Sequence, residues 1–324
     1  MNVRRVLPRD AIPSVDEPRF SGAYDGDADD AVVAVTAADP PRAYPVRYLE
    51  FHEIVNDALD GASSDDPIAV TWCPLCGSAV VYDRSHAGRT LEFGVSGKLA
   101  DDDLVMYDRE TGSEWKQSTG ECIAGEFESE SLSVRPAAVL SVGGFRESYP
   151  DGVVLDPPGG ESEAASDGDE PAPIDYAESP YEAYAAGEGF GLAAHRGAAD
   201  GREWDGPADL NPKEVVLGVE FDGEALGFAF SRVRAAGGVA RATVGHRDVV
   251  AFATDDGIHA YADPGCEFEK ADDAVVGDGT TWDPTTGTAA DGRRLDRLPA
   301  RRLYAFTWLD DHGSDAFHRP ESID

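Results

Sequence analysis

The segment TWCPLCG at residues 71–77 places two cysteines, Cys73 and Cys76, three positions apart. Two thiolates at this spacing on a tight turn can bind one metal ion, because a tetrahedral ion accepts sulfur ligands at about 2.3 Å. The same spacing suits reversible disulfide chemistry, in which one thiol attacks and the other resolves the mixed disulfide. A third interpretation is a buried turn with two inert thiols. The sequence has no second CxxC pair to decide among these.

A second polar group lies in the segment HEIVND, residues 52–57. We expect a helix over residues 47–59, because its apolar residues fall on one face at about 100° per residue. His52 lies near the centre of that face, and Asn56 follows one turn later. The pattern therefore predicts an inward-facing His52 with Asn56 beside it.

The neighbouring acids are expected to be exposed. Glu53 and Asp57 fall on the opposite face of the predicted helix and are interpreted as solvated. The run Asp101 to Asp103 offers oxygen ligands for a cation. On the surface of so acidic a chain, however, these three residues are interpreted as solvated. HEIVN does not match the HExxH motif of zinc proteases, since Asn56 stands where the second histidine is required.

These residues predict one candidate site with two possible chemistries. In the metal version, Cys73, Cys76 and His52 are ligands of zinc or another transition metal, and one position stays open for water or substrate. In the redox version, Cys73 attacks, Cys76 resolves, and His52 assists formation of the thiolate. Asn56 supports the site in both versions. Cys122 is interpreted as a buried small residue in a strand.

Charge restricts the classes of partner. The chain has 63 acidic and 27 basic residues, which gives a formal charge of −36. Such self-repulsion is screened only at high ionic strength, where the Debye length falls to about 3 Å at 1 M. The composition is typical of proteins from a high-salt cytosol. Nucleic acid is excluded as a partner because no basic patch is visible, which leaves a small molecule or a protein.

The sequence predicts a cytoplasmic location. No apolar run approaches the roughly 20 residues needed to cross a bilayer, so no membrane span is expected. The N-terminus MNVRRVLPRDAIP has two arginines but no apolar core, and it does not match a secretory signal.

Composition divides the chain into three parts. We expect a first repeat at 1–155, an acidic linker rich in Pro, Gly and Ser at 156–175, and a second, degenerate repeat at 176–324. The two halves align in order, with Trp72 to Asp83 opposite Phe252 to Asp263 and Trp115 opposite Trp282. Cys73 and Cys76 have no counterpart in the second copy, so we expect any chemistry in the first.

The strand patterns predict the fold class. Segments such as PIAVTW and DLVMYDR have the length and composition of strands and are separated by turn residues. A second short helix is expected in GGFRESYP, residues 143–150. We therefore expect an α+β fold that is mainly β, made of two copies of a β-rich repeat with few short helices.

Five motifs in order resemble those of domain of unknown function 3179, a family found in bacteria and archaea. They are RAYPVRYLEFHEIVND, VTWCPLCGSAVVYDR, LEFGVSG, DDLVMYDRETGSEW and GECIAG. The resemblance covers nearly the whole chain and implies no reaction, since the family is uncharacterised. It does imply importance for residues within the motifs, namely His52, Glu53, Asn56, Asp57, Cys73, Pro74, Cys76, Gly77, Gly94, Ser96, Gly97, Tyr107, Asp108, Arg109 and Trp115.

Two functions remain open at this point. The first is a metal-binding or redox-active thiol site, with enzymatic activity undecided. The second is a non-catalytic binding or scaffold protein, in which the cysteine turn is a structural staple and the two halves form a groove between them.

Overall fold

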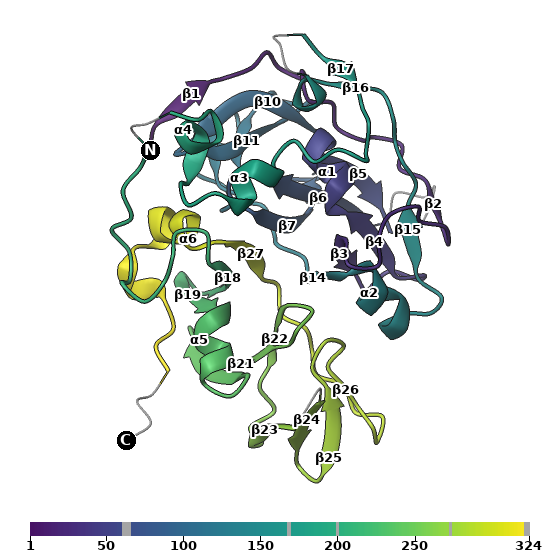
Figure 1. Ribbon diagram of the computed structural model, residues 1–324, viewed down its shortest axis with the longest axis vertical. Coiled ribbons are helices and arrows are strands. Elements are labelled where there is room, and N and C mark those ends of the chain that lie inside the picture. Colours follow the sequence, from purple (N-terminus) through teal and green to yellow (C-terminus); the bar gives the residue numbers. More distant parts are fainter. Residues whose placement is uncertain (60–65, 167–169, 199–200, 272–273, 321–324) are drawn as a thin grey trace.

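The computed structural model describes residues 1–59, 66–166, 170–198, 201–271 and 274–320. The structure is 40% strand and 14% helix, which confirms the predicted mainly β class. In Figure 1 the elements from β1 to α4 form the upper part of the molecule, and residues beyond β18 form most of the lower part.

Two five-stranded sheets belong to the first half of the chain. The first consists of β1 (Val3–Arg5), β10 (Phe93–Ala100), β11 (Asp103–Asp108), β12 (Glu114–Lys116) and β13 (Cys122–Ala124). The second consists of β14 (Ala138–Ser141), β3 (Ala31–Val35), β4 (Arg42–Pro45), β15 (Val153–Leu155) and β2 (Phe20–Ser21).

A six-stranded sheet joins the two halves. Its strands, in spatial order, are β19 (Glu224–Ala229), β18 (Val215–Phe221), β27 (Arg301–Tyr304), β7 (Ser78–Asp83), β6 (Pro67–Cys73) and β5 (Ile54–Ala58). Strand β27 meets β7 where Arg302 faces Ala79. Strand β27 of the second half therefore lies beside β7 of the first (Figure 1).

Smaller sheets complete the β structure. In the second half they are β20 (Val239–Val244), β21 (Arg247–Ala253) and β22 (Ile258–Ala262), followed by β23 (Phe268–Ala271), β24 (Ala274–Gly277), β25 (Thr280–Asp283) and β26 (Thr288–Ala289). In the first half they are β8 (Ser85–His86) with β9 (Arg89–Thr90), and β16 (Glu161–Ser162) with β17 (Ala172–Pro173).

The helices are short. They are α1 (Val46–His52), α2 (Val142–Ser148), α3 (Glu182–Ala186), α4 (Gly191–His195), α5 (Phe230–Ala235) and α6 (Ala305–His312), with 3₁₀ turns η2 (Glu163–Ala165) and η3 (Ser314–Ala316). Helix α2 confirms the helix expected near residues 143–150. In the part of the chain that the structure describes, no helix has the length and apolarity to cross a membrane.

Helix α1 differs from the prediction. It ends at His52, and residues 54–58 form strand β5 instead. The chain changes direction at Glu53, whose backbone takes a left-handed φ of 57°. The β-branched Ile54 and Val55 then suit an extended segment that pairs with β6. The predicted helix over residues 47–59 is therefore confirmed for residues 47–52 and wrong for residues 53–59. His52 is 3% exposed, which confirms its inward position, but Asn56 lies in β5 and not one helical turn beyond it.

The two halves contain elements in the same order. The first half runs from the strand pair β3 and β4 to α2, and the second runs from the pair β18 and β19 to α6. In both, a buried tyrosine packs on a glycine with positive φ, Tyr82 on Gly120 and Tyr261 on Gly287. Common descent of the two halves stays a prediction, because element order does not measure ancestry.

The segment expected as a linker lies against the first half over its described part. Ser162 is fully buried, and the amide of Glu163 donates to the carbonyl of Ala11 at 2.8 Å. Residues 167–169 lie outside the described residues. Tyr176, at the expected start of the second repeat, contacts His52 in the first half. The division at 156 and 175 therefore stays a prediction.

Candidate functional site

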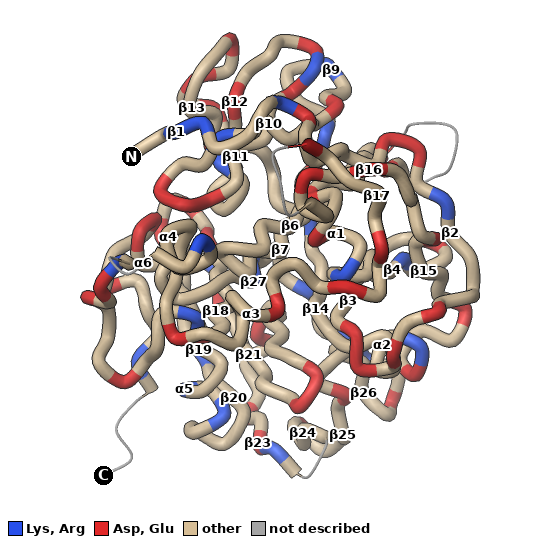
Figure 2. The backbone as a smooth tube through the Cα atoms, turned by 45° about the horizontal axis from the view of Figure 1, so that its top comes forward, with Lys and Arg blue, Asp and Glu red and all other residues tan. Residues whose placement is uncertain are grey.

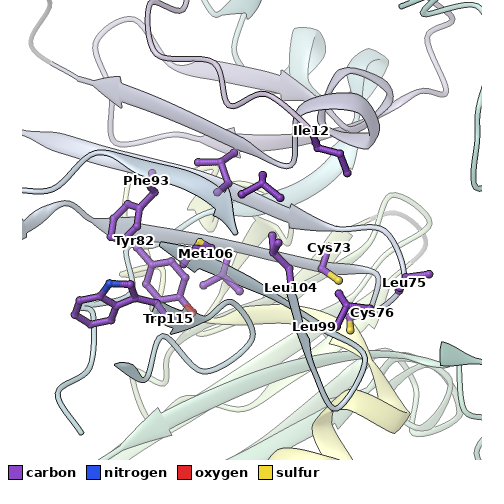
Figure 3. Packing of buried hydrophobic residues seen from close by; sticks show 14 of the residues in the cluster. Ile12, Cys73, Leu75, Cys76, Tyr82, Phe93, Leu99, Leu104, Met106 and Trp115 are labelled. Atoms are coloured by element: carbon purple, nitrogen blue, oxygen red, sulfur yellow. The ribbon is translucent and has the colours of Figure 1, made fainter. Parts of the chain in front are cut away.

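The CPLCG turn lies at the junction of β6 and β7. All seven residues of β6 are buried, so the strand carries Cys73 into the interior, and Cys76 is buried as well. Gly77 has a φ of 53°, and a Cβ there would lie 2.6 Å from the ring of Tyr304. Glycine is therefore required for the turn to close against the C-terminal half. Both thiols are free, and Figure 3 shows the two sulfurs close together in the core.

Asp103 completes a group of three possible ligands. One atom each from Cys73, Cys76 and Asp103 lies within 4.8 Å of the others, and all three residues are buried. In Asp103, Oδ2 accepts a hydrogen bond from the amide of Ser118 at 2.8 Å. Its Oδ1 atom is buried and has no hydrogen-bond partner among the described residues. A buried carboxylate oxygen with no donor is costly, so this atom marks a place for a cation or a proton.

Burial determines the protonation of this group in the metal-free protein. It raises the pKa of Asp103 to about 6, although the nearby Lys116 ammonium opposes the rise. Burial also raises the pKa of Cys73, against a hydrogen bond from Cys76. The pKa of Cys76 lies well above its usual range, because burial and then Cys73 and Asp103 disfavour a thiolate. Both cysteines are therefore thiols unless a cation replaces their protons.

The acids at residues 101–103 do not all lie in solvent, which corrects the sequence prediction. Asp103 has no exposed surface, and Asp102 is 7% exposed. The carboxylate of Asp102 instead forms ion pairs with Arg4 and with Arg202. The sequence pattern misses this because Asp103 is the first residue of β11, a strand whose six residues are all buried.

The C-terminal half closes one side of the group. The amide of Tyr304 donates to the carbonyl of Cys76 at 2.8 Å. Thr307 in α6 is buried, and its hydroxyl opposes part of the rise in the pKa of Cys76. Further along α6, Asp311 forms a buried ion pair with Lys116 of β12. The site is thus built from residues of both halves of the chain.

The segment around α3 covers the turn from another side. The hydroxyl of Tyr184 donates to the carbonyl of Leu75 at 2.7 Å and accepts from the amide of Gly191 at 3.0 Å. Leu192 and Phe190 belong to the same hydrophobic cluster as the two cysteines. This cluster also contains Trp115, one of the residues within the family motifs.

Glu53 is a second buried carboxylate near the group. It is 7% exposed, and its Oε2 atom is buried with no hydrogen-bond partner in the part of the chain that the structure describes. Burial raises the pKa of Glu53 to about 8, and Glu163 and Asp103 add to the rise. The expected solvated position is therefore wrong for Glu53. It is also wrong for Asp57, which accepts hydrogen bonds from Arg42 and Tyr44 at 2.5 Å each.

His52 and Asn56 have other partners. One ring nitrogen of His52 lies 2.9 Å from the carbonyl of Pro13, and the other lies 2.6 Å from the hydroxyl of Tyr176. Asn56 exchanges hydrogen bonds with the backbone of Phe93 at 2.8 and 2.9 Å. The structure thus brings Cys73 and Cys76 together with Asp103, while both nitrogens of His52 are already engaged.

Comparison with known proteins identifies the family. The sequence profile of DUF3179, described as a protein of unknown function, matches residues 9–319. The chain belongs to the DUF3179 family. No curated protein and no solved structure matches this chain. The DUF3179 match agrees with the resemblance read from the motifs, and the activity must therefore be argued from the site.

Proposed function

We propose that this DUF3179 protein binds one divalent transition metal ion, zinc best matching the ligands, at Cys73, Cys76 and Asp103. The observation that carries the proposal is the approach of two sulfurs and one carboxylate oxygen to within 4.8 Å of one another inside the core. Zinc accepts thiolate sulfur and carboxylate oxygen in a tetrahedral arrangement. The unpartnered Oδ1 of Asp103 supports the proposal, because metal binding would satisfy it.

Glu53 offers the fourth ligand. It lies outside the 4.8 Å group, so a rotation of its side chain must bring Oε2 to the metal. Its left-handed backbone holds a non-glycine residue in a strained conformation, and such strain concentrates at functional positions. Four protein ligands would make the centre structural, in contrast to the open position expected from the sequence.

Such a centre would join parts of the protein that are distant in sequence. Cys73 and Cys76 come from the turn after β6, and Asp103 comes from β11. Strand β27 and helix α6 rest directly on the turn. Binding energy of a structural metal is folding energy, so the ion would stabilise the junction of the two halves.

The redox alternative is less favoured by the same geometry. A reactive thiol needs partial exposure and an environment that stabilises the thiolate. Cys73 is 1% exposed and Cys76 has no exposed surface. Their burial also raises both pKa values, which leaves little thiolate for attack on a disulfide.

Elemental mass spectrometry with a thiol count tests the proposal. The protein should be purified in molar salt without a metal-affinity tag, and about one zinc per chain is expected. The variants Cys73→Ser, Cys76→Ser and Asp103→Asn should lose the ion. The matched control Cys122→Ser removes a buried thiol of another strand and should retain it. A metal-free protein whose two thiols oxidise reversibly would overturn the proposal in favour of the redox site.

We also propose that the protein works in a high-salt cytosol with a small molecule or a protein as partner. Acidic residues are scattered over all parts of the backbone in Figure 2, and with 63 against 27 they outnumber the basic residues. The formal charge of −36 supports this environment, because molar salt screens the repulsion between surface carboxylates.

A further inference from the structure

A cavity of about 400 Å³ lies between the two halves, and its lining includes none of Cys73, Cys76 and Asp103. Strand β14 of the first half and β22 of the second both contribute to its lining, and Figure 1 places both at the junction. The approach is close, since a Cβ on Gly257 would lie 2.7 Å from the carbonyl of Val139. The volume is within the range of about 300–1,000 Å³ that holds small molecules.

The walls of the cavity are mostly apolar. Leu140 and Val33 contribute from the first half, and Leu217, Ile258 and Leu298 contribute from the second. All five are at most 6% exposed. An apolar body of modest size would therefore be removed from water on binding, which stabilises a complex by about 25 cal/mol for each Å² buried.

Two arginines line this cavity, and within the described ranges neither forms an ion pair with a carboxylate. They are Arg297 and Arg302. The guanidinium of Arg302 donates to the carbonyl of Gly77 and lies over the rings of Trp72 and Tyr304. Both cations therefore lie in one cavity without an acidic partner among the described residues. They leave positive charge available for an anion.

Neutral groups hold Arg297 in place. One of its terminal nitrogens donates to the hydroxyl of Tyr261 at 2.8 Å and to the carbonyl of Thr285. The other lies 3.3 Å from Nδ1 of His259, which is 1% exposed. Because an arginine can only donate, Nδ1 accepts and His259 is neutral. The guanidinium is therefore oriented without loss of its charge.

Three carboxylates also line the cavity, and they restrict where an anion can lie. Asp255 is engaged with Arg234 at 3.2 Å, and Asp256 accepts from the hydroxyl of Ser141 at 3.0 Å. Asp29, like these two, is exposed. All three are therefore hydrated at the solvent side, and the favourable position for an anion is beside the arginines.

We propose that this cavity binds a small carboxylate with an apolar body, its carboxylate placed against Arg297 and its body against the walls from β14 and β22. None of the proposed metal ligands lines this cavity, although Arg302 contacts the cysteine turn at Gly77. The sequence analysis predicted a groove between the two halves, and small carboxylates are the class of ligand that we propose for it.

Calorimetric titration of the full-length protein in molar salt with 2-naphthoate tests this proposal, with 2-naphthamide as the uncharged probe of similar size. We expect 2-naphthoate to bind about tenfold or more tightly than the amide, which corresponds to one charge-assisted pair. Equal affinities for the two probes, or no heat from either, would overturn the proposal.

Three variants locate the binding. Arg297→Gln should weaken 2-naphthoate about tenfold and leave the amide nearly unchanged. Arg294→Gln removes the same charge from an exposed position three residues away and should have no effect. Val139→Trp should fill the cavity and abolish binding of both probes, and as Val139 is partly exposed this variant should fold. Unaltered binding in Val139→Trp, or equal losses in both arginine variants, would refute this location.

Discussion

The backbone amide of Tyr304 donates a hydrogen bond of 2.8 Å to the carbonyl of Cys76. Residues 228 positions apart are thereby joined at the one turn that carries two cysteines, since 304 − 76 = 228. The environment of the turn cannot be explained from the first half alone, because Tyr304 of β27 and Thr307 of α6 contact Cys76.

Replacement of Asp103 tests whether a metal is bound. The sign of its effect on the free energy of unfolding should depend on the presence of the metal. If the metal is bound, Asp103→Asn removes a ligand and should lower the free energy of unfolding by about 2–5 kcal/mol. After removal of the metal with a chelator, the same change should be neutral or stabilising, because a buried carboxylate without a full set of donors is replaced by a neutral amide. Chemical denaturation with and without chelator measures both values.

Asp101→Asn is the matched control for this experiment. Asp101 is two residues away and only partly buried, and its carboxylate accepts from the backbone amide of Asn2. We expect a change within about 0.5 kcal/mol in either condition. A stability loss in Asp103→Asn that is the same before and after chelation would contradict a role in metal binding.

Replacement of Lys116 tests the contact between α6 and the first half. Its ion pair with Asp311 is buried, with side-chain exposures of 6% and 2%. Lys116→Met leaves the carboxylate of Asp311 in the interior without its partner, so the variant should lose about 3–5 kcal/mol. The double variant Lys116→Met with Asp311→Leu should recover most of this loss.

An exposed pair provides the comparison for Lys116. Arg293 and Asp278 lie at the surface, with side-chain exposures of 44% and 60%. Arg293→Met should cost no more than about 1 kcal/mol, because water screens such pairs. Similar losses for the buried and the exposed variant would show that α6 does not pack on β12 as described.

Glu50 predicts a dependence of stability on pH. Burial raises its pKa to about 7, although a hydrogen bond from Ser179 opposes the rise. Because the folded-state pKa is above that of the unfolded chain, Glu50 favours folding when protonated, and this contribution is lost as pH rises from about 4.5 through 7. Glu50→Gln should therefore stabilise the protein by about 1–3 kcal/mol at pH 8 and hardly at all at pH 4.5. Equal effects at both pH values would show that Glu50 titrates normally.

Salt should stabilise the fold. Raising KCl from about 0.1 M to about 2 M shortens the Debye length from about 10 Å to below about 3 Å and screens the charge of −36. We expect the midpoint of thermal unfolding to rise by at least about 10 °C, in contrast to a sorbitol solution of equal osmolality, which leaves the charges unscreened. A midpoint that follows osmolality alone would assign the effect to solvent exclusion.

Several features of the site follow from short-range patterns and could be predicted. The strand period places Cys73 at the end of a buried strand, and Gly77 is needed for the turn beside Cys76. The helix near residues 143–150 has an N-cap, since Ser141 accepts a hydrogen bond from the amide of Gly144 at 2.9 Å. Such signals depend only on neighbours in the chain, which is why the sequence reveals them.

The position of α1 shows where local patterns fail. Residues 47–59 have a helical distribution of apolar side chains, but β6 offers Ile54 and Val55 a full set of strand partners. Pairing with a neighbouring strand outweighs the weak helical preference of the segment. The positions of His52, Glu53 and Asn56 all follow from this one change, because the positive φ at Glu53 ends the helix and changes the direction of the chain.

The sequence by itself determined the family, the mainly β class, the pair of thiols and the extreme negative charge, because each depends on residue types and local spacing. Only the tertiary structure decided that Asp103 joins Cys73 and Cys76, and that one cavity between the halves is lined by two arginines with no ion pair to a described carboxylate. Burial and partnership are properties of three-dimensional packing. Asp101, Asp102 and Asp103 are identical in residue type and adjacent in the sequence, so the sequence does not indicate which of them is buried.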